Sequence, residues 1–260
     1  MPLFFWPTYA FLFGLCFGSF ANVLIRRLPR GLPVITPPSA CPECGQRLRA
    51  WDLVPVLSWL VLRGRCRYCN GPVSVRYPAV ELLCGLLFAG MALLTPTLSA
   101  IPLALFAFVL LCVSAIDIDT REIPDGLLVF GGVVGVLWVA LGRFAPAAFP
   151  LVPGIAGAAL GALAGGLTLF LVDMLVLLLA KKYGFGFGDV KLMAMAGLFL
   201  GWQLVAVAFV FAFVSGGAFA AFLLLTRRAK RGDYLAFGPF LAVGCLCALW
   251  WGRAFIGLLA

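Results

Sequence analysis

Long apolar runs separated by shorter polar segments dominate the chain, and this pattern predicts an all-α polytopic membrane protein. About 20 apolar residues cross a bilayer as a helix, and shorter runs can cross when the bilayer thins or the chain is kinked. We expect about eight spans. They cover about residues 4–25, 78–94, 100–116, 126–141, 154–180, 190–200, 202–225 and 237–259. The sixth, 190–200, is the shortest.

Basic residues support this layout because they gather in alternate loops. With the arginine-rich segment 26–77 placed in the cytoplasm, all but two of the nineteen lysines and arginines fall on the cytoplasmic side. Only Arg143 and Arg253 fall on the other side. Cytoplasmic loops carry an excess of Lys and Arg, so we expect both termini outside.

Composition agrees with a membrane protein and narrows its function. Hydrophobic residues make up 64% of the chain and charged residues 11%, whereas soluble domains are about 45–50% apolar and about 25% charged. The net charge of +9 follows from the basic loops, which favours positive-inside bias over nucleic-acid binding. The first apolar run lacks a preceding basic segment and a cleavage site, so we expect a retained helix.

The chain contains no histidine. This absence excludes Ser-His-Asp and Cys-His catalysis, and zinc proteases of the His-Glu-x-x-His type. A hydrolase built on this sequence would have to use Asp, Glu, Lys, Ser or Cys.

Four of the nine cysteines form two C-x-x-C units in the polar segment, namely Cys41, Cys44, Cys66 and Cys69. Two such knuckles can present four thiolates to one Zn²⁺, as in a zinc ribbon. Disulfides seldom persist in the cytoplasm, and a closed shell of four thiolates leaves no position for a catalytic water, so we expect structural zinc. A redox pair and incidental cysteines are the alternatives. The apolar stretch 51–60 between the knuckles is expected to be the core of this module, or less readily to lie on the membrane.

Acidic residues stand at two predicted helix ends. Asp117 directly follows the span 100–116, and Asp189 lies in the glycine-rich segment 184–192. A carboxylate at the edge of a bilayer is costly and indicates a functional site. If the two ends are neighbours, the carboxylates can share one proton and activate one water, which is the chemistry of an aspartyl protease. Glycines beside Asp189 would let an extended substrate backbone approach.

Structural explanations remain open for each of these acids. Asp125 and Asp189 could cap helices, and Asp119 and Glu122 could form ion pairs in a solvated loop. Structural pairing is the preferred interpretation of Asp173. The same interpretation is preferred for Glu81, and Lys191 could simply mark the cytoplasmic interface.

The segment Gly186-Phe-Gly188-Asp189-Val-Lys191-Leu is similar to the GxGD signature of the type IV prepilin peptidases. Presenilin-like and signal-peptide-peptidase-like proteases share this tetrad. Further segments resemble the prepilin peptidases in the same order along the chain: 18–29, 41–45, 66–69, 76–83 and 116–125. The resemblance covers about residues 14–250. Phe185 and Phe187 depart from it, because small residues are frequent at those positions.

The resemblance implies a dual enzyme of the bacterial inner membrane. Its aspartic endopeptidase would use Asp117 and Asp189, supported by Gly186, Gly188 and Lys191, to cut the basic leader of type IV prepilins and type II secretion pseudopilins after a glycine on the cytoplasmic side. Members with the cysteine loop also N-methylate the new N-terminal residue, usually phenylalanine, with S-adenosylmethionine. The candidates for that second activity are Gly18, Asn22, Arg26 and Glu81. The implied parts are a first transmembrane helix (1–25), a methyltransferase-associated zinc loop (26–77) and a seven-helix protease core (78–260).

Two other interpretations compete with this one. A transporter or channel could use Asp117, Asp173 and Asp189 as ion or proton ligands, although such proteins often show repeated halves and we find no repeat. A membrane scaffold could recruit a partner through the zinc loop, and it would tolerate Asp-to-Asn changes.

Overall fold

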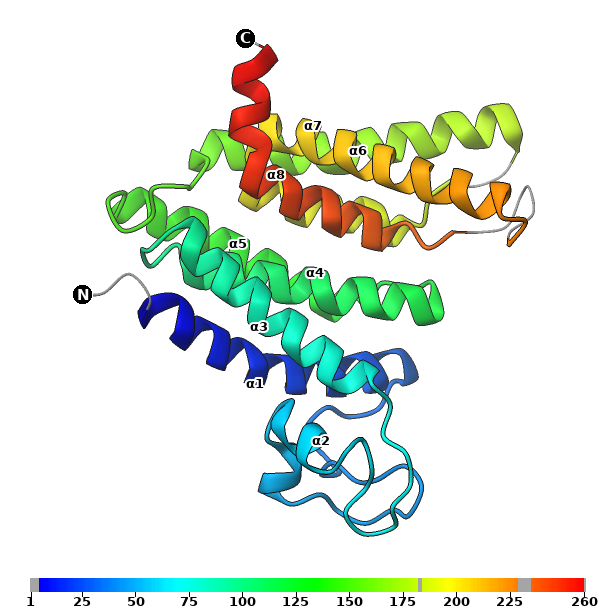
Figure 1. Ribbon diagram of the computed structural model, residues 1–260. Helices are drawn as coiled ribbons and strands as arrows, with labels where there is room; N and C mark the ends of the chain where they lie inside the picture. The colour runs from blue at the N-terminus through cyan, green and yellow to red at the C-terminus, as the bar shows by residue number, and fades with distance from the viewer. Residues whose placement is uncertain (1–4, 182–183, 229–234, 260) are drawn as a thin grey trace. The chain divides into compact units, whose positions relative to one another are not determined.

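The computed structural model describes residues 5–181, 184–228 and 235–259 (Figure 1). Its described part is helical, with isolated β-bridges only in the cysteine segment. The chain divides into two compact units, Met1–Pro96 and Thr97–Ala260. The first unit holds α1 (Phe5–Arg27), η1 (Leu28–Arg30), η2 (Ala50–Leu53), α2 (Leu57–Val61) and α3 (Arg76–Leu94), and the second holds α4 (Ala100–Thr120), α5 (Asp125–Phe144), α6 (Gly154–Ala180), α7 (Phe187–Leu225) and α8 (Gly238–Leu259).

Among the described residues, seven helices are long and apolar enough to cross a membrane. The predicted all-α membrane fold is therefore confirmed. The difference from eight spans arises in α7, a 39-residue helix that contains both the sixth and the seventh predicted span.

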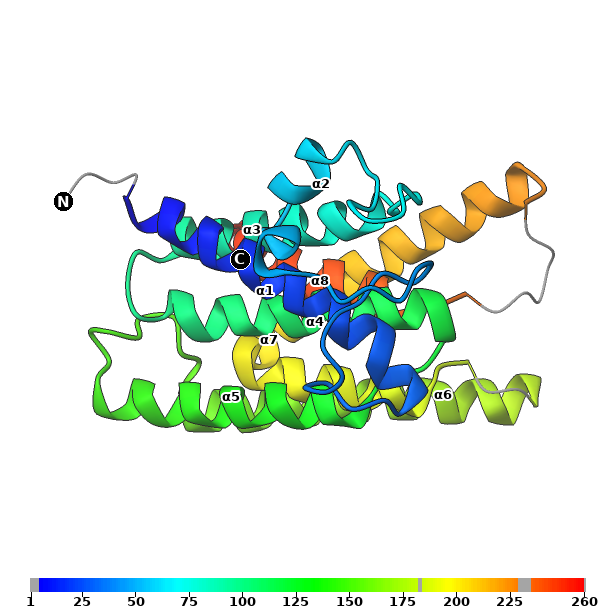
Figure 2. The same ribbon diagram turned by 90° about the horizontal axis from the view of Figure 1, so that it is seen from below.

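Helix α7 is not straight. A continuous helix of that length would measure about 58 Å, nearly twice the hydrocarbon thickness of a bilayer. Gly201 interrupts it with φ 71° and ψ 168°, and Figures 1 and 2 show the chain turning back there, so that both ends of α7 lie at the same end of the second unit. The two arms of this hairpin correspond to the predicted spans 190–200 and 202–225.

In the first unit, α1 and α3 pack through small residues. A Cβ atom placed on Gly18 would lie 2.5 Å from Glu81 Cα, and one on Gly14 would lie 2.7 Å from Gly85 Cα. The two backbones therefore touch, as small-residue interfaces allow in lipid. Helix α3 thus belongs to the same compact unit as α1 and the cysteine segment. The sequence analysis had instead grouped α3 with the later helices, in a core of residues 78–260. The functional division of the chain stays a prediction.

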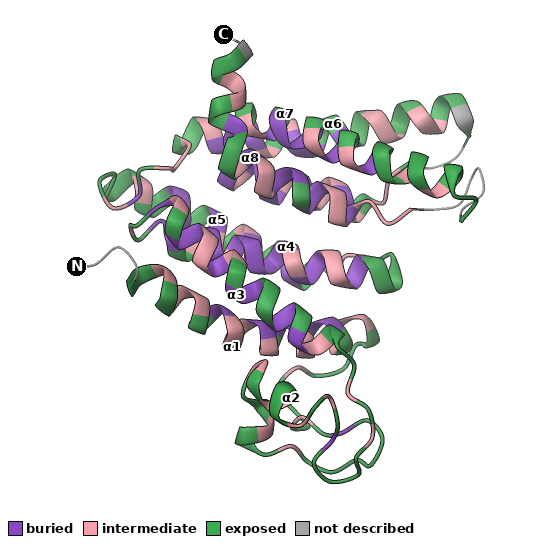
Figure 3. Ribbon diagram, viewed as in Figure 1, coloured by how far each residue is buried: buried purple, intermediate pink, exposed green. Residues whose placement is uncertain are grey.

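In the second unit, α4 is the most buried of the candidate spans and α6 the most exposed, as the colouring of Figure 3 illustrates. Helix α6 packs closely on the first arm of α7, where a Cβ on Gly161 would overlap the Gly197 carbonyl. The rings of Phe106 and Phe199 stack with centroids 4.3 Å apart in the core.

The ends of these helices collect the predicted chemistry. Figure 1 shows that the end of α4, the start of α5, both ends of α7 and the start of α8 lie at one end of the second unit. The loops at this end carry Arg121, Lys181 and Arg227. Lys182, Lys230 and Arg231, which the charge pattern also assigned to the cytoplasm, lie outside the described residues.

The stretch 51–60 differs from its expected role as a module core. Trp51, Leu57 and Leu60 are more than half exposed, so that preference was wrong. Trp59 does turn inward, because its indole Nε1 donates to the Val73 carbonyl at 2.9 Å. Half of the ten residues in 51–60 are therefore exposed and the other half are half-buried.

We predict that Gly201→Ala destabilises the second unit by about 1–3 kcal/mol, since its backbone conformation is open essentially to glycine alone. A Cβ there would also lie 2.8 Å from Pro153 Cβ. Thermal unfolding in detergent measures the effect. Gly217→Ala is the matched control in the same helix, because a Cβ there meets nothing within 4 Å; equal stability of the two variants would contradict the prediction.

Candidate active site and metal centre

A pocket of about 430 Å³ opens at the shared helix ends of the second unit. Three segments line it: the end of α4 with the start of α5, the start of α7, and the residues before α8. Its lining comprises Asp117, Arg121, Glu122, Ile123, Asp125, Gly186, Phe187, Gly188, Asp189, Lys191, Ala236 and Phe237. The two acids singled out from the sequence, Asp117 and Asp189, thus face one cavity.

Asp117 lies in the last turn of α4 and is only 6% exposed. Its Oδ2 accepts a hydrogen bond from the Gly238 backbone N–H at 2.9 Å. Gly238 begins α8, where backbone N–H groups lack partners within the helix and the helix dipole favours an anion. The start of α8 therefore holds this carboxylate in place.

Asp189 lies in the first turn of α7 and is 7% exposed. Its Oδ2 accepts a hydrogen bond from the Gly186 backbone N–H at 3.1 Å, so the acid does cap its helix. Its Oδ1, however, is buried and has no hydrogen-bond partner among the described residues. A buried polar atom without a partner is costly, so capping explains only half of this carboxylate.

The two carboxylates constrain each other. Both are more than nine-tenths buried and both line one pocket. Two carboxylates in such a site repel when both are ionised, and sharing one proton relieves the repulsion. A shared proton would also provide the partner that Asp189 Oδ1 lacks.

The glycine-rich segment before α7 is anchored from two sides. Asp173 of α6 accepts hydrogen bonds at its Oδ1 from the backbone N–H groups of Gly184 at 2.7 Å and Phe185 at 2.9 Å. The Phe185 ring packs on Phe237, with centroids 4.9 Å apart, and on Phe213 at 6.2 Å. Asp173 therefore has the structural role preferred for it, and the bulk of Phe185 ties the segment to α7 and α8.

Gly188 and Lys191 connect α7 to the segment 121–125, which joins α4 to α5. A Cβ on Gly188 would lie 2.9 Å from Ile123 Cβ, so a side chain there would push the loop away. Lys191 Nζ bonds both carboxylate oxygens of Asp125, at 2.8 and 3.0 Å, and lies 5.1 Å from the centre of the Phe187 ring. These contacts position the start of α7 against the start of α5.

The four cysteines of the first unit form a compact cluster. All four Sγ atoms lie within 4.8 Å of one another, and those of Cys41 and Cys69 are 3.9 Å apart. Four sulfurs bound tetrahedrally at about 2.3 Å would be separated by about 3.8 Å. The donor set and its spacing therefore fit a Zn²⁺ ion.

Two equivalent turns build this cluster. The Gly45 N–H donates to the Cys41 carbonyl and the Asn70 N–H to the Cys66 carbonyl, each at 3.0 Å. Gly45 and Asn70 adopt φ values of 69° and 59°, in the left-handed region that glycine and asparagine tolerate best. Gly45 and Asn70 thus close the two knuckles.

The thiols differ in acidity before any metal binds. The Cys44 backbone N–H and neighbouring donors lower the pKa of Cys41 to about 7, despite burial. The Gly71 backbone N–H favours the Cys69 thiolate, but desolvation and hydrogen bonds with the other thiols outweigh it and raise the pKa of Cys69 to about 12. A cation would favour release of the protons that the cluster retains.

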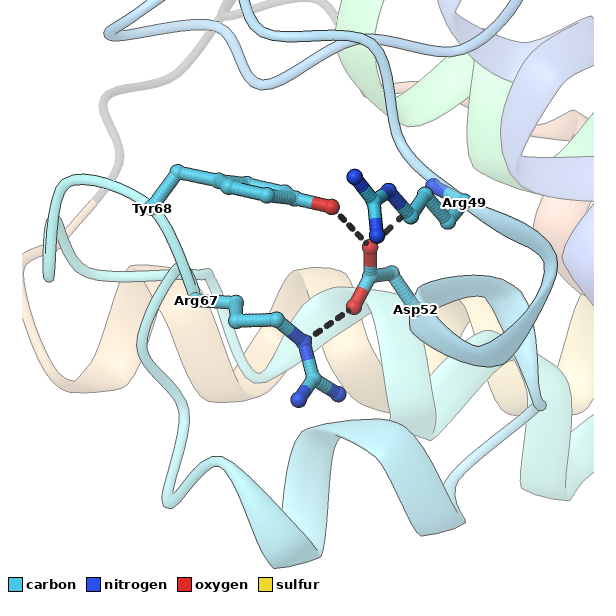
Figure 4. Close-up of polar contacts among 4 residues, drawn as sticks. All are labelled: Arg49, Asp52, Arg67 and Tyr68. Atoms are coloured by element: carbon cyan, nitrogen blue, oxygen red, sulfur yellow. Dashed lines mark hydrogen bonds and ion pairs between the residues drawn. The ribbon is translucent and has the colours of Figure 1, made fainter.

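A buried carboxylate ties the second knuckle to η2 (Figure 4). Asp52 accepts hydrogen bonds from Arg67 Nε at 2.7 Å, from the Tyr68 hydroxyl at 2.9 Å and from the Arg49 backbone N–H at 3.1 Å. Burial raises the pKa of Asp52, but these donors outweigh burial and lower it below its usual value. The network therefore stabilises the module above the unfolded-state pKa of Asp52, and this contribution is lost as the pH falls through the lower, folded-state pKa.

Comparison with known proteins assigns the family. Residues 12–95 match the family model described as "Bacterial Peptidase A24 N-terminal domain". Residues 104–221 match the model described as "Type IV leader peptidase family". The prepilin leader peptidase/N-methyltransferase of Burkholderia pseudomallei (strain K96243) is 38% identical over 97% of this chain and 87% of the relative. Proteins of that name from Aeromonas salmonicida (strain A449) and Pseudomonas aeruginosa (strain PAO1) are 36% and 35% identical, each over 93% of this chain and 89% of the relative. The chain belongs to the type IV leader peptidase family. No solved structure matches it.

The four candidate residues for methyl transfer, Gly18, Asn22, Arg26 and Glu81, lie where α1 packs against α3. Gly18 packs against Glu81, Asn22 Nδ2 donates to the Tyr77 carbonyl at 3.1 Å, and Glu81 Oε2 accepts from the Val56 N–H at 2.7 Å. Arg26 Nη1 lies 3.5 Å from the Tyr77 hydroxyl. These contacts join the four residues to other residues of the first unit. Their role in that activity stays a prediction.

Sequence analysis missed Gly238, which supplies the hydrogen bond to Asp117. Its only signal was a Gly-Pro pair at the start of an apolar run, which predicts a helix start. Nothing in that pattern identifies the acid that the helix start would meet.

We predict that Gly238→Ala lowers peptidase turnover up to about a hundredfold with little change in KM, because an added Cβ would lie 2.8 Å from Asp117 Oδ2 and displace it. Steady-state cleavage of a prepilin measures this. Gly257→Ala in the same helix, where a Cβ meets nothing within 4 Å, should behave as wild type. Wild-type turnover by Gly238→Ala would show that this contact does not position Asp117.

Proposed function

We propose that Asp117 and Asp189 are the catalytic dyad with which this chain cleaves prepilin leaders. The observation that carries the proposal is the shared pocket, in which both carboxylates are buried and Asp189 Oδ1 has no described partner. As a member of its family, the chain is an aspartic endopeptidase and an N-methyltransferase of the bacterial inner membrane. Membership of a peptidase family also favours hydrolysis over the transporter and scaffold interpretations.

The dyad acts as a general acid–base pair. The ionised carboxylate takes a proton from a water molecule as the water attacks the scissile carbonyl, and the protonated one donates to the developing oxyanion. Asp189 is the better placed to carry the shared proton, because its Oδ1 accepts no hydrogen bond from a described residue. Each acid accepts one backbone N–H at a helix start, so that contact does not distinguish them, and Asp117 is left as the ionised member because Asp189 carries the proton.

The surrounding residues position the dyad and the substrate. Gly186 and Gly188 present backbone without side chains beside Asp189, which lets an extended peptide approach. Lys191 holds α7 to α5 through Asp125 rather than contacting the carboxylates of the dyad. Cleavage after a glycine on the cytoplasmic side, with pseudopilins as further substrates, follows from the family resemblance and the charge pattern.

The cysteine cluster holds structural zinc in this proposal. Four thiolates fill the tetrahedral shell of Zn²⁺, so the metal would stabilise the small module and offer no position for a reacting water. S-adenosylmethionine is the methyl donor that the second activity requires. The new N-terminal residue, usually phenylalanine, receives the methyl group.

Asp117→Asn or Asp189→Asn should lower leader cleavage at least about a hundredfold, because neither amide can share the dyad's proton. Mass spectrometry of a purified prepilin incubated with each variant in detergent records the cut and any added methyl group together.

Asp119→Asn is the matched control, since Asp119 is an exposed acid two residues from Asp117. Circular dichroism and thermal unfolding verify that each variant folds. Normal cleavage by either folded dyad variant would refute the proposed active site.

Cys41→Ser should remove most of the bound zinc and reduce methylation more than cleavage, because Cys41 belongs to the first unit and the dyad to the second. Metal content by plasma mass spectrometry and the two product masses test this. Cys16→Ser, outside the cluster, should keep both. Equal loss of both activities would instead make the module part of the peptidase.

A further inference from the structure

The segment between the two knuckles exposes an apolar surface. On α2, Leu57, Leu60 and Val61 are 60%, 56% and 76% exposed, and their spacing places them on one side of the helix. The exposed apolar residues of the preceding turn add to them, and Figure 3 shows η2 and α2 mostly in the colour of exposed residues. We use the name η2–α2 face for the exposed apolar side chains of this segment, which are those of Trp51, Leu53, Val54, Leu57, Leu60 and Val61. Exposed apolar patches of this kind mark interaction sites.

The backbone holds the start of this helix in an unusual conformation. Val56, the residue before α2, has φ 62° and ψ −49°, which is a genuine outlier for a β-branched residue. Its N–H donates to Glu81 Oε2 of α3 at 2.7 Å. This bond fixes the start of α2 beside a membrane-spanning helix of the same unit.

The position of that bond along α3 shows which part of this helix the segment lies beside. Glu81 follows the first residue of α3, Arg76, by five residues, and at 1.5 Å per residue it lies about 7.5 Å inside the helix. The start of α2 therefore runs beside the first turns of a span rather than beyond its end.

Charge on the same segment complements an anionic surface. Residues 26–77 contain nine arginines and two acidic residues, for a formal charge of +7, which is most of the net charge of the chain. Arg47, Arg49, Arg63 and Arg65 flank the η2–α2 face in sequence and are exposed. Trp51 adds an aromatic ring of the type that favours the membrane interface.

We propose that the η2–α2 face docks on the anionic lipid surface beside α3 and seats the cysteine module on the bilayer. The module is joined at both ends to membrane helices, at Arg27 and Arg76. This tether keeps the face close to lipid at high effective concentration, which favours lipid over a second copy of the chain or a soluble partner. The proposal is independent of the peptidase dyad.

Tryptophan quenching in nanodiscs tests the proposal on the full-length chain. The discs contain phosphatidylcholine alone or an equimolar mixture with phosphatidylglycerol, each with or without bromine on the acyl chains. Subtracting the emission of Trp51→Phe from that of wild type isolates Trp51. The expected result is quenching of Trp51 by brominated lipid, stronger with phosphatidylglycerol, together with protection from aqueous acrylamide.

Trp59 is the matched internal control, isolated with Trp59→Phe. It is two residues from Leu57 but turns inward to Val73, so brominated lipid should quench it much less. Replacing Arg47 or Arg63 by Gln should lower the ratio of docked to undocked module about fivefold for each arginine in the anionic discs. Leu57→Asp with Leu60→Asp should abolish lipid quenching of Trp51 while unchanged Trp59 emission shows that the module folds.

Three results would overturn the proposal. The first is ready quenching of Trp51 by acrylamide and none by brominated lipid. The second is lipid quenching that disappears when a prepilin is added, which would make the substrate the occupant. The third is protection of Trp51 only in discs with two copies of the chain, which would make the face a dimer contact.

Discussion

Burial of negative charge at the edge of a membrane is the constraint on which the second unit depends. Asp117 and Asp189 each lose most of their contact with water, and each is compensated by a backbone N–H at or beside the first turn of a helix. Such donors have no partner within the helix and are fixed before any substrate arrives. The starts of α7 and α8 must therefore lie beside the end of α4. That requirement is met because α7 turns back at Gly201 and returns to the end of the unit where it began.

In the first unit, the loop between α1 and α3 has a small core, so other contacts must stabilise its structure. Paired knuckles bring four sulfurs together, and the buried carboxylate of Asp52 joins the second knuckle to η2. The bond from Val56 N–H to Glu81 ties this loop to α3, and the bond from Asn22 to the Tyr77 carbonyl joins α1 to α3. The module and its helices therefore fold as one compact unit, which corresponds to the separate N-terminal family match.

The sequence was informative wherever local pattern determines structure. Apolar runs marked the helices, cysteine spacing marked the metal cluster, and poor solvation of Asp117 and Asp189 marked two acids that do line one pocket. It failed where the decisive contact joins distant segments. Gly238 could not be matched to Asp117, nor Asp173 to the backbone of Gly184, because a donor's partner depends on tertiary packing. The stretch 51–60 was misjudged because hydrophobicity alone does not distinguish the core of a module from an exposed apolar surface.

The first arm of α7 has a consequence for the helices around it. From Phe187 to the break at Gly201 it is about 21 Å long at 1.5 Å per residue, shorter than a hydrocarbon core of about 30 Å. Neighbouring helices cover this arm, because every residue from Gly188 to Leu200 is buried or half-buried and Gly201 is buried as well. The break in the helix therefore lies inside the protein, where irregular backbone at membrane depth is tolerated. Since Asp189 stands in the first turn of this arm, water reaches its carboxylate through the pocket lined by protein side chains.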